Sequence, residues 1–203
     1  MLTVFINEIP LILCDAEEAK NFVNDKKTLK GRFLNLKMLH AYLDMMEKPH
    51  EFEQVVVWSE DYKALKTGFK GLFKIIKAAG GVVKNSKNEI LFIFRRGSWD
   101  LPKGKIEKDE KKKIAAIREI QEETGLQQVV LGDAICKTYH VYTFNEKRVL
   151  KKTYWYNMTT ISDETLVPQA EEDIEQAVWM SKNAFFAEKR VVYKNILAVL
   201  EAS

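Results

Sequence analysis

Residues Gly104–Leu126 read GKIEKDEKKKIAAIREIQEETGL. The stretch opens on one glycine and ends just after another, and the residues before the second glycine contain neither Gly nor Pro, which predicts a helix. At about 100° per residue, Glu119, Glu122 and Glu123 fall within an arc of roughly 100° on that helix. Ile120 and Ile117 lie roughly 100° and 160° from Glu119 on the same wheel, outside this arc. The sequence therefore predicts a helix that packs on one side and presents three carboxylates on another.

Three carboxylates this close to one another repel, and each raises the pKa of the others unless a cation neutralises them. Hard divalent cations prefer oxygen ligands, and Mg²⁺ is commonly held by a few carboxylates together with substrate phosphate. On composition alone, a solvated acidic helix face is the alternative interpretation. The fixed spacing of the whole stretch favours a metal site.

That spacing is Gly, five residues, Glu, seven residues, then Arg-Glu-Ile-Gln-Glu-Glu-Thr-Gly-Leu. It resembles the Nudix box, GX5EX7REUXEEXGU with U aliphatic, and every fixed position is filled. The resemblance implies a metal-dependent hydrolase of a nucleoside diphosphate linked to another moiety, with Mg²⁺ or Mn²⁺ as cofactor. It also implies an α/β (α+β) fold, an α/β/α sandwich with a mixed sheet, over residues 75–203. Asp109 and Lys111 stand where many members have Gly and Ser, so Asp109 is expected to cap the helix instead of Lys111.

The resemblance also implies a set of metal ligands. Glu119, Glu122 and Glu123 are expected to bind the metal, and the carbonyl of Gly104 or Lys103 is expected to add a backbone ligand. In the family, the Glu that follows the Arg acts as a ligand or as the general base, so both roles stay open for Glu119.

Other residues are expected to support catalysis. Arg118 is expected to orient a box carboxylate through a bidentate pair. Glu110 and Gly125 are expected to be structural, with a water-mediated metal role as the alternative for Glu110. The acidic loop that contains Glu171 and Glu172 resembles a late loop from which family members supply a general base or an extra ligand; Glu172 is the candidate, and a plain acidic loop is the alternative.

The segment Trp99–Gly104 indicates the substrate class. It resembles the Trp-x-Leu-Pro-Lys-Gly segment of dinucleoside polyphosphate and diphosphoinositol polyphosphate hydrolases. Lys103, Arg95 and Arg96 are therefore candidate contacts to substrate phosphate, whereas Lys111–Lys113 are expected to form a solvated helix face. A ligand-sensing protein that uses the fold only for binding is the alternative function, although such relatives commonly have damaged boxes and this box is intact.

Residues 1–74 precede the box domain and carry no recognisable motif. Their pattern predicts a small α/β module that performs no chemistry and packs on the second domain or on another subunit. The expected elements are a hairpin of strands 2–6 and 11–13, a helix from Asp15 to Val23, a helix from Gly31 to Glu47, a strand at 54–58, and a helix capped by Ser59.

Composition is ordinary for a soluble globular protein: 46% of the 203 residues are hydrophobic, 30% are charged, and the net charge is +3. A small charge of this size does not indicate a nucleic-acid partner, so a small-molecule phosphoanhydride is the expected partner. Cys14 and Cys136 are expected to be free buried thiols. The N-terminus lacks the pattern of a signal peptide and no run is long enough to span a membrane, so a cytoplasmic location is expected. A homodimer stays an open alternative.

Overall fold

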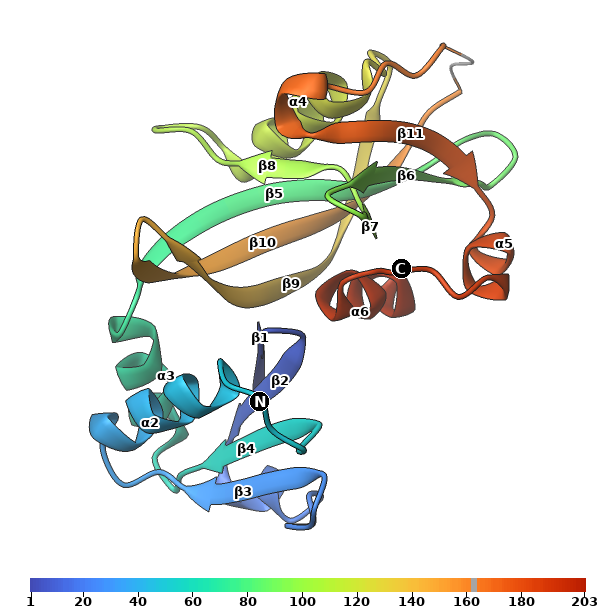
Figure 1. Ribbon diagram of the computed structural model, residues 1–203. Coiled ribbons are helices and arrows are strands. Elements are labelled where there is room, and N and C mark those ends of the chain that lie inside the picture. Colours follow the sequence, from blue (N-terminus) through green and yellow to red (C-terminus); the bar gives the residue numbers. More distant parts are fainter. Residues whose placement is uncertain (162–163) are drawn as a thin grey trace. The chain divides into compact units, whose positions relative to one another are not determined.

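The computed structural model describes residues 1–161 and 164–203, and these divide into two compact units (Figure 1). The first unit comprises Met1–Ile76 together with Tyr139–Lys151, and the second comprises Lys77–Thr138 together with Lys152–Ser203. Residues 139–151 are the tip of a long hairpin, and they belong to the first unit although they follow the box in sequence. No helix among the described residues is long and apolar enough to cross a bilayer.

The first unit is a sheet with helices on both faces. In β2, Leu11 and Leu13 join the large core beneath α2 and α3, whereas the alternate residues Ile12 and Cys14 join a smaller core beside Ala19 of α1. This alternation follows from the two-residue period of a strand. Strands β2, β3 and β4 are parallel, and β1 is antiparallel to β2. The elements are β1 Leu2–Ile6, β2 Ile9–Cys14, α1 Ala16–Ala19, β3 Thr28–Arg32, α2 Leu36–Met46, β4 Gln54–Trp58 and α3 Tyr62–Gly71.

Two details of the first unit correct the sequence prediction. Gly31 lies in β3, which pairs with β4, and the predicted helix begins only at Leu36 with Asn35 as its cap. Asp61 caps α3 and accepts a hydrogen bond from the N–H of Ala64, so the prediction that Ser59 caps this helix is wrong. The hairpin and the strand Gln54–Trp58 are confirmed, and Asp15 caps α1, but this helix ends at Ala19, so its predicted end at Val23 is wrong.

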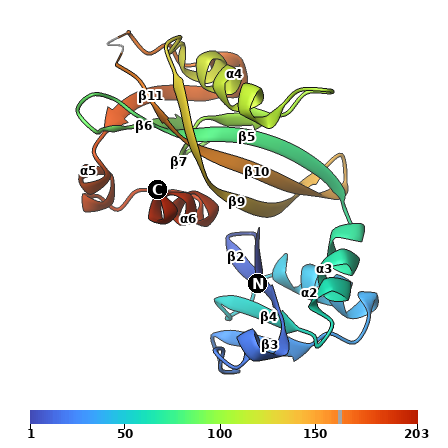
Figure 2. The same ribbon diagram turned by 180° about the vertical axis from the view of Figure 1, so that it is seen from behind.

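The second unit is a sheet between two helical layers, with α4 on one face and α6 on the other (Figures 1 and 2). In β5, Ala79 and Val83 pack towards α4, whereas Val82 packs towards α6. The predicted α/β sandwich is confirmed. The elements are β5 Lys74–Lys84, β6 Ile90–Arg95, β7 Ser98–Asp100, β8 Lys103–Lys105, α4 Lys112–Thr124, β9 Val130–Phe144, β10 Lys147–Thr159, the 3₁₀ turn η1 Ala170–Glu172, β11 Ile174–Met180, α5 Lys182–Ala187 and α6 Lys194–Ala202.

Candidate active site

Helix α4 carries the carboxylates, and its two ends are built differently. It ends at Gly125, which has a φ of 73° and donates its N–H to the Gln121 carbonyl at 2.9 Å. A Cβ at Gly125 would lie 2.9 Å from the Cβ of Val167, so both conformation and space favour glycine. At the other end, Lys111 occupies the cap position without a side-chain hydrogen bond. Asp109 has a φ of 63° and is not the cap, so that prediction is wrong.

Arg118 is the centre of the charged network on α4. Its Nε and Nη2 donate to the two carboxylate oxygens of Glu110, each at 2.9 Å. Its Nη1 donates to Glu119 at 2.8 Å and to Glu122 at 2.7 Å, and Nη2 also reaches the Lys105 carbonyl at 3.0 Å. One guanidinium therefore ties the loop before α4 to two carboxylates of the helix. The expected bidentate pair is present, and its partner is Glu110.

The carboxylate of Glu119 lies directly over the backbone of Gly104 in β8. A Cβ built on Gly104 would meet Oε2 of Glu119 at 1.7 Å, so only glycine leaves room for this carboxylate. The Glu119 side chain is largely buried, and burial raises its pKa. Arg118 opposes that rise, while Glu122 and Glu172 add to it. Negative charge therefore gathers beside the backbone of Gly104, whose carbonyl was predicted to be a metal ligand.

Glu123 is buried on the same side of α4. Its side chain is 2% exposed, and Oε2 accepts the backbone N–H of Lys103 at 2.8 Å. Burial raises the pKa of Glu123 to about 7, although the charges of Lys103 and Arg95 oppose the rise. Through this hydrogen bond, Glu123 attaches β8 to α4 and thereby brings Gly104 under Glu119.

Lys103 and Arg95, two predicted phosphate contacts, point into the protein. The Lys103 ammonium is 4% exposed and donates to Oδ2 of Asp100 at 2.5 Å. Arg95 donates to the same oxygen through Nε and Nη2, each at 3.2 Å. Burial alone would raise the pKa of Asp100, but Lys103 and Arg95 outweigh it and the pKa is lowered. In this arrangement the ammonium of Lys103 is not at the surface, where substrate phosphate would arrive.

Asp100 is the residue that sequence reasoning passed over. The sequence pattern that could have identified Asp100 is its position between two hydrophobic residues, three residues before Lys103. This position places a buried carboxylate within reach of the lysine. A second omitted residue is Asp173, whose Oδ2 accepts from Nε and Nη2 of Arg96 at 3.0 and 2.9 Å. That pair is exposed, so Arg96 keeps a solvent-facing guanidinium.

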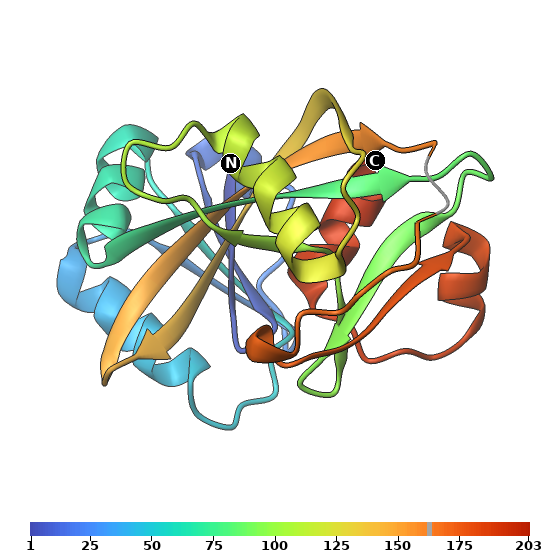
Figure 3. The ribbon, with the colours of Figure 1, turned by 90° about the horizontal axis from the view of Figure 1, so that it is seen from above.

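The segment before β11 runs beside the C-terminal end of α4, as the view from above shows (Figure 3). Val167 donates its N–H to the Thr124 carbonyl at 2.8 Å, and Gln169 donates to the Glu123 carbonyl at 3.2 Å. These bonds hold η1 near the carboxylates. Glu172 is close enough to affect both Glu119 and Arg95 electrostatically.

A metal ion needs several ligand atoms that converge on one point, and the carboxylates of α4 can be checked against this requirement. Among residues 1–161 and 164–203, no three His, Cys, Asp or Glu side chains converge on one point suited to a metal, and Arg118 lies among the acids instead. The donor chemistry nevertheless fits a hard divalent cation, because Glu119, Glu122 and Glu123 are carboxylates of one helix, α4, and Glu119 lies against the backbone of Gly104.

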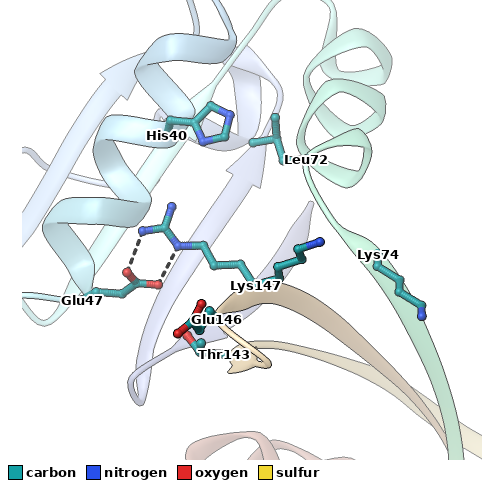
Figure 4. A pocket seen from close by; sticks show the side chains of 8 residues that line it. His40, Glu47, Leu72, Lys74, Thr143, Glu146 and Lys147 are labelled. Atoms are coloured by element: carbon teal, nitrogen blue, oxygen red, sulfur yellow. Dashed lines mark hydrogen bonds and ion pairs between the residues drawn. The ribbon is translucent and has the colours of Figure 1, made fainter.

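A separate cavity of about 560 Å³ lies in the first unit (Figure 4). Its lining carries both signs of charge. Arg148 pairs with Glu47 at 2.6 Å and with Asp44 at 2.5 Å, so two carboxylates face its one positive charge. None of the residues predicted to perform chemistry lies here. The lining is His40, Glu47, Leu72, Lys74, Thr143, Glu146, Lys147 and Arg148.

Several known proteins resemble part of this chain. An 8-oxo-(d)GTP phosphatase from Mycolicibacterium smegmatis is 33% identical over 90 residues, which is 44% of this chain and 26% of that protein. A curated relative from Mycobacterium tuberculosis is 37% identical over 87 residues, 42% of this chain and 33% of its own length. This chain thus matches about a third or less of each relative. The crystal structure of the MutT protein from Methanosarcina mazei Go1 aligns with a TM-score of 0.48 at 24% identity, covering 64% of this chain and 92% of that one.

The family model of the NUDIX domain matches residues 74–200, more than half of the chain. This range contains the box, the α4 carboxylates and the η1 loop. The chain therefore belongs to the NUDIX domain family.

Proposed function

We propose that this protein hydrolyses a phosphoanhydride bond of a small molecule that is nucleoside-diphosphate-linked or carries a polyphosphate, with Mg²⁺ or Mn²⁺ as cofactor. The observation that carries the proposal is the Glu119 carboxylate seated against Gly104, where a Cβ would not fit. Glu122 and Glu123 lie beside it on α4, and Arg118 holds Glu119 and Glu122 in place. Family membership supports the same reaction class.

Each residue has a distinct role in this proposal. Glu119, Glu122, Glu123 and the Gly104 carbonyl would hold the metal, which would neutralise phosphate charge and activate water when bound. Arg118 is a positioning residue because it contacts carboxylates of the box, including Glu110, at hydrogen-bonding distance.

Two carboxylates, Glu119 and Glu172, are the candidates for the general base. Glu119 is the more buried, and burial raises its pKa. Glu172 lies on η1, close enough to interact electrostatically with Glu119. Glu172→Gln separates the two roles: if Glu172 is the base, kcat falls while the metal concentration for half-maximal activity is unchanged. Unchanged kcat assigns the base to Glu119.

The substrate class comes from two sources. The segment Trp99–Gly104 resembles that of dinucleoside polyphosphate and diphosphoinositol polyphosphate hydrolases. The relative from M. smegmatis is named an 8-oxo-(d)GTP phosphatase, which adds an oxidised nucleoside triphosphate. All these molecules contain a phosphoanhydride flanked by further phosphate.

The test is a panel of these substrates with the full-length protein, in Mg²⁺ and in Mn²⁺, with products identified by mass spectrometry. Glu122→Gln should lower turnover about a hundred-fold, the size of effect seen when one electrostatic contact to a transition state is lost. Glu122 is exposed, so the variant should fold. Glu175→Gln, an exposed acid on β11, is the matched control and should retain turnover.

The competing function is ligand sensing without turnover. Under that alternative, at least one substrate binds in calorimetry, yet no product forms with either metal. Such a result would overturn the proposal of an enzyme, since family membership alone does not separate a hydrolase from a binding protein.

A further inference from the structure

Two lysine ammonium groups from different elements of the second unit lie over the ring of Tyr154 on β10, and a third lysine adds its charge to the surroundings of the phenol. The ammonium of Lys152, two residues earlier on the same strand, lies 4.6 Å from the ring centroid. The ammonium of Lys112, the first residue of α4, lies 4.9 Å from it. Lys77 of β5 interacts electrostatically with the same phenol. We call Lys77, Lys112, Lys152 and Tyr154 the Tyr154 cluster.

The Tyr154 cluster concentrates positive charge. Burial raises the pKa of Tyr154, but a hydrogen bond with Lys152 and the charges of Lys152, Lys77 and Lys112 outweigh burial and lower it. Lys77 and Lys112 are exposed, and neither forms an ion pair with any residue that the structure describes. Like charges gathered from separate elements repel one another, and no carboxylate in residues 1–161 and 164–203 forms an ion pair with either lysine that would offset this repulsion.

The surroundings add to the positive potential. The first turn of α4 contains no acidic residue, although acids are usually favoured at the positive end of a helix dipole. Tyr154 itself packs against the apolar core beneath α4, which fixes the ring that the ammonium groups flank. The cluster is therefore an ordered cationic surface, and its chemistry suits a ligand with several negative charges.

We propose that the Tyr154 cluster binds phosphate groups of the substrate that lie beyond the bond being cleaved. This inference rests on the proposed function. Lys112 and Glu119 are seven residues apart on α4, so their Cα atoms are separated by roughly 10 Å along the helix axis. A substrate with a chain of phosphates, or with several phosphates on one ring, reaches both places. A substrate with a single diphosphate does not, so the cluster selects for multiply phosphorylated substrates.

Binding is measured first without catalysis, so that the result does not depend on hydrolysis. Full-length protein in EDTA is titrated with inorganic tripolyphosphate in a calorimeter at low salt, where charge interactions are strongest. Lys112→Gln should weaken binding about five-fold, since one exposed ion pair has a modest energy. Lys77→Gln should behave in the same way. The control Lys87→Gln removes an exposed lysine from the β5–β6 turn and should change binding less than two-fold.

Three outcomes of the titration would overturn the proposal. Absence of measurable tripolyphosphate binding is the first. The second is an equal loss for Lys87→Gln and Lys112→Gln, which would show attraction by net charge alone. The third is tighter binding of single-stranded RNA than of tripolyphosphate with the same dependence on Lys112, which would assign the cluster to a nucleic acid.

A kinetic measurement then connects the cluster to the substrate. Once a hydrolysed substrate is known, Lys112→Gln should raise KM for a compound with additional phosphates and leave KM for a single diphosphate unchanged. Equal changes in KM for both compounds would overturn the inference. If no compound is hydrolysed but tripolyphosphate binds as expected, the proposed enzymatic function fails while the anion site stands.

Discussion

Gly104 is the residue whose identity the site constrains most tightly. The Glu119 carboxylate occupies the space of a Cβ at this position, at 1.7 Å from its ideal place. Any side chain here must displace Glu119 or separate β8 from α4. Overpacking of this kind typically costs about 1–3 kcal/mol in cores.

Gly104→Ala should therefore lower hydrolysis at least ten-fold and lower the free energy of unfolding by about 1–3 kcal/mol. The measurements are kcat/KM with the best substrate of the panel and unfolding in urea. Gly71→Ala is the matched control, because nothing lies within 4 Å of a Cβ at this last residue of α3. Full activity in Gly104→Ala would show that the contact between the Glu119 carboxylate and the Gly104 backbone has no part in catalysis.

Asp100 belongs to the same scale, because its one carboxylate accepts hydrogen bonds from two cations inside the protein, Lys103 and Arg95. Asp100→Asn should lower the free energy of unfolding by about 3–5 kcal/mol, the usual effect of removing one partner of a buried pair. Lys103 would keep its ammonium inside the protein without that partner. Denaturant unfolding of the full chain measures the change.

The control for Asp100→Asn uses the exposed pair of Arg96 and Asp173. Asp173→Asn should change stability by less than about 1 kcal/mol, because solvent screens an exposed ion pair. Lys103→Met combined with Asp100→Asn should recover part of the loss, since both charges are then removed. Similar losses for Asp100→Asn and Asp173→Asn would contradict the buried-pair account.

At the scale of elements, the start of α4 lacks the hydrogen bond that most helices have. Lys111 has extended dihedral angles, φ −78° and ψ 134°, that suit a capping side chain, but lysine supplies no acceptor. Serine would accept from the first-turn N–H groups. Lys111→Ser should therefore raise the free energy of unfolding by about 1 kcal/mol.

The comparison for that prediction is α2, whose cap Asn35 accepts from the N–H of Met38 at 3.1 Å. Asn35→Ala should lower stability by about 1 kcal/mol, the opposite sign on a helix of similar length. Both variants are measured by thermal and urea unfolding. A neutral or destabilising Lys111→Ser would mean that water or the backbone already satisfies the start of α4.

At the scale of the whole molecule, the hairpin tip decides how the chain can be divided. Tyr139 and Val141 of β9 and Leu150 of β10 are buried in the core of the first unit, and Phe5 and Ile6 of β1 pair with β9 there. Removing the first unit at Ile76 would expose these side chains, and exposed apolar surface of this kind favours aggregation.

A fragment of residues 77–203 should therefore be poorly soluble. The same fragment with residues 139–151 replaced by an Asn-Gly turn should be soluble and should keep its substrate profile, since Asn-Gly suits a two-residue hairpin. Size-exclusion chromatography and kcat/KM are the measurements. A soluble, monomeric 77–203 fragment with its tip intact would show that the first unit is not needed to cover the hairpin.

Sequence alone determined what depends on near neighbours. Regular spacing predicted α4 and its end at Gly125, since a helix and its left-handed glycine are local features. It also placed Glu110 and Arg118 eight residues apart, and the structure joins them. The alternation of the β1–β2 hairpin was likewise readable, because strand periodicity is local.

Only the tertiary structure decided which charged groups are buried and which meet. The sequence predicted that Lys103 contacts phosphate at the surface, but in the structure its ammonium is buried and pairs with Asp100, which also binds Arg95. Strand β3 has no apolar alternation and exists because it pairs with β4. The sequence predicted that Lys112 belongs to a solvated helix face, whereas the structure places its ammonium over the ring of Tyr154 in β10. Burial and long-range pairing depend on contacts between distant segments, and the pattern of one segment does not contain its partner.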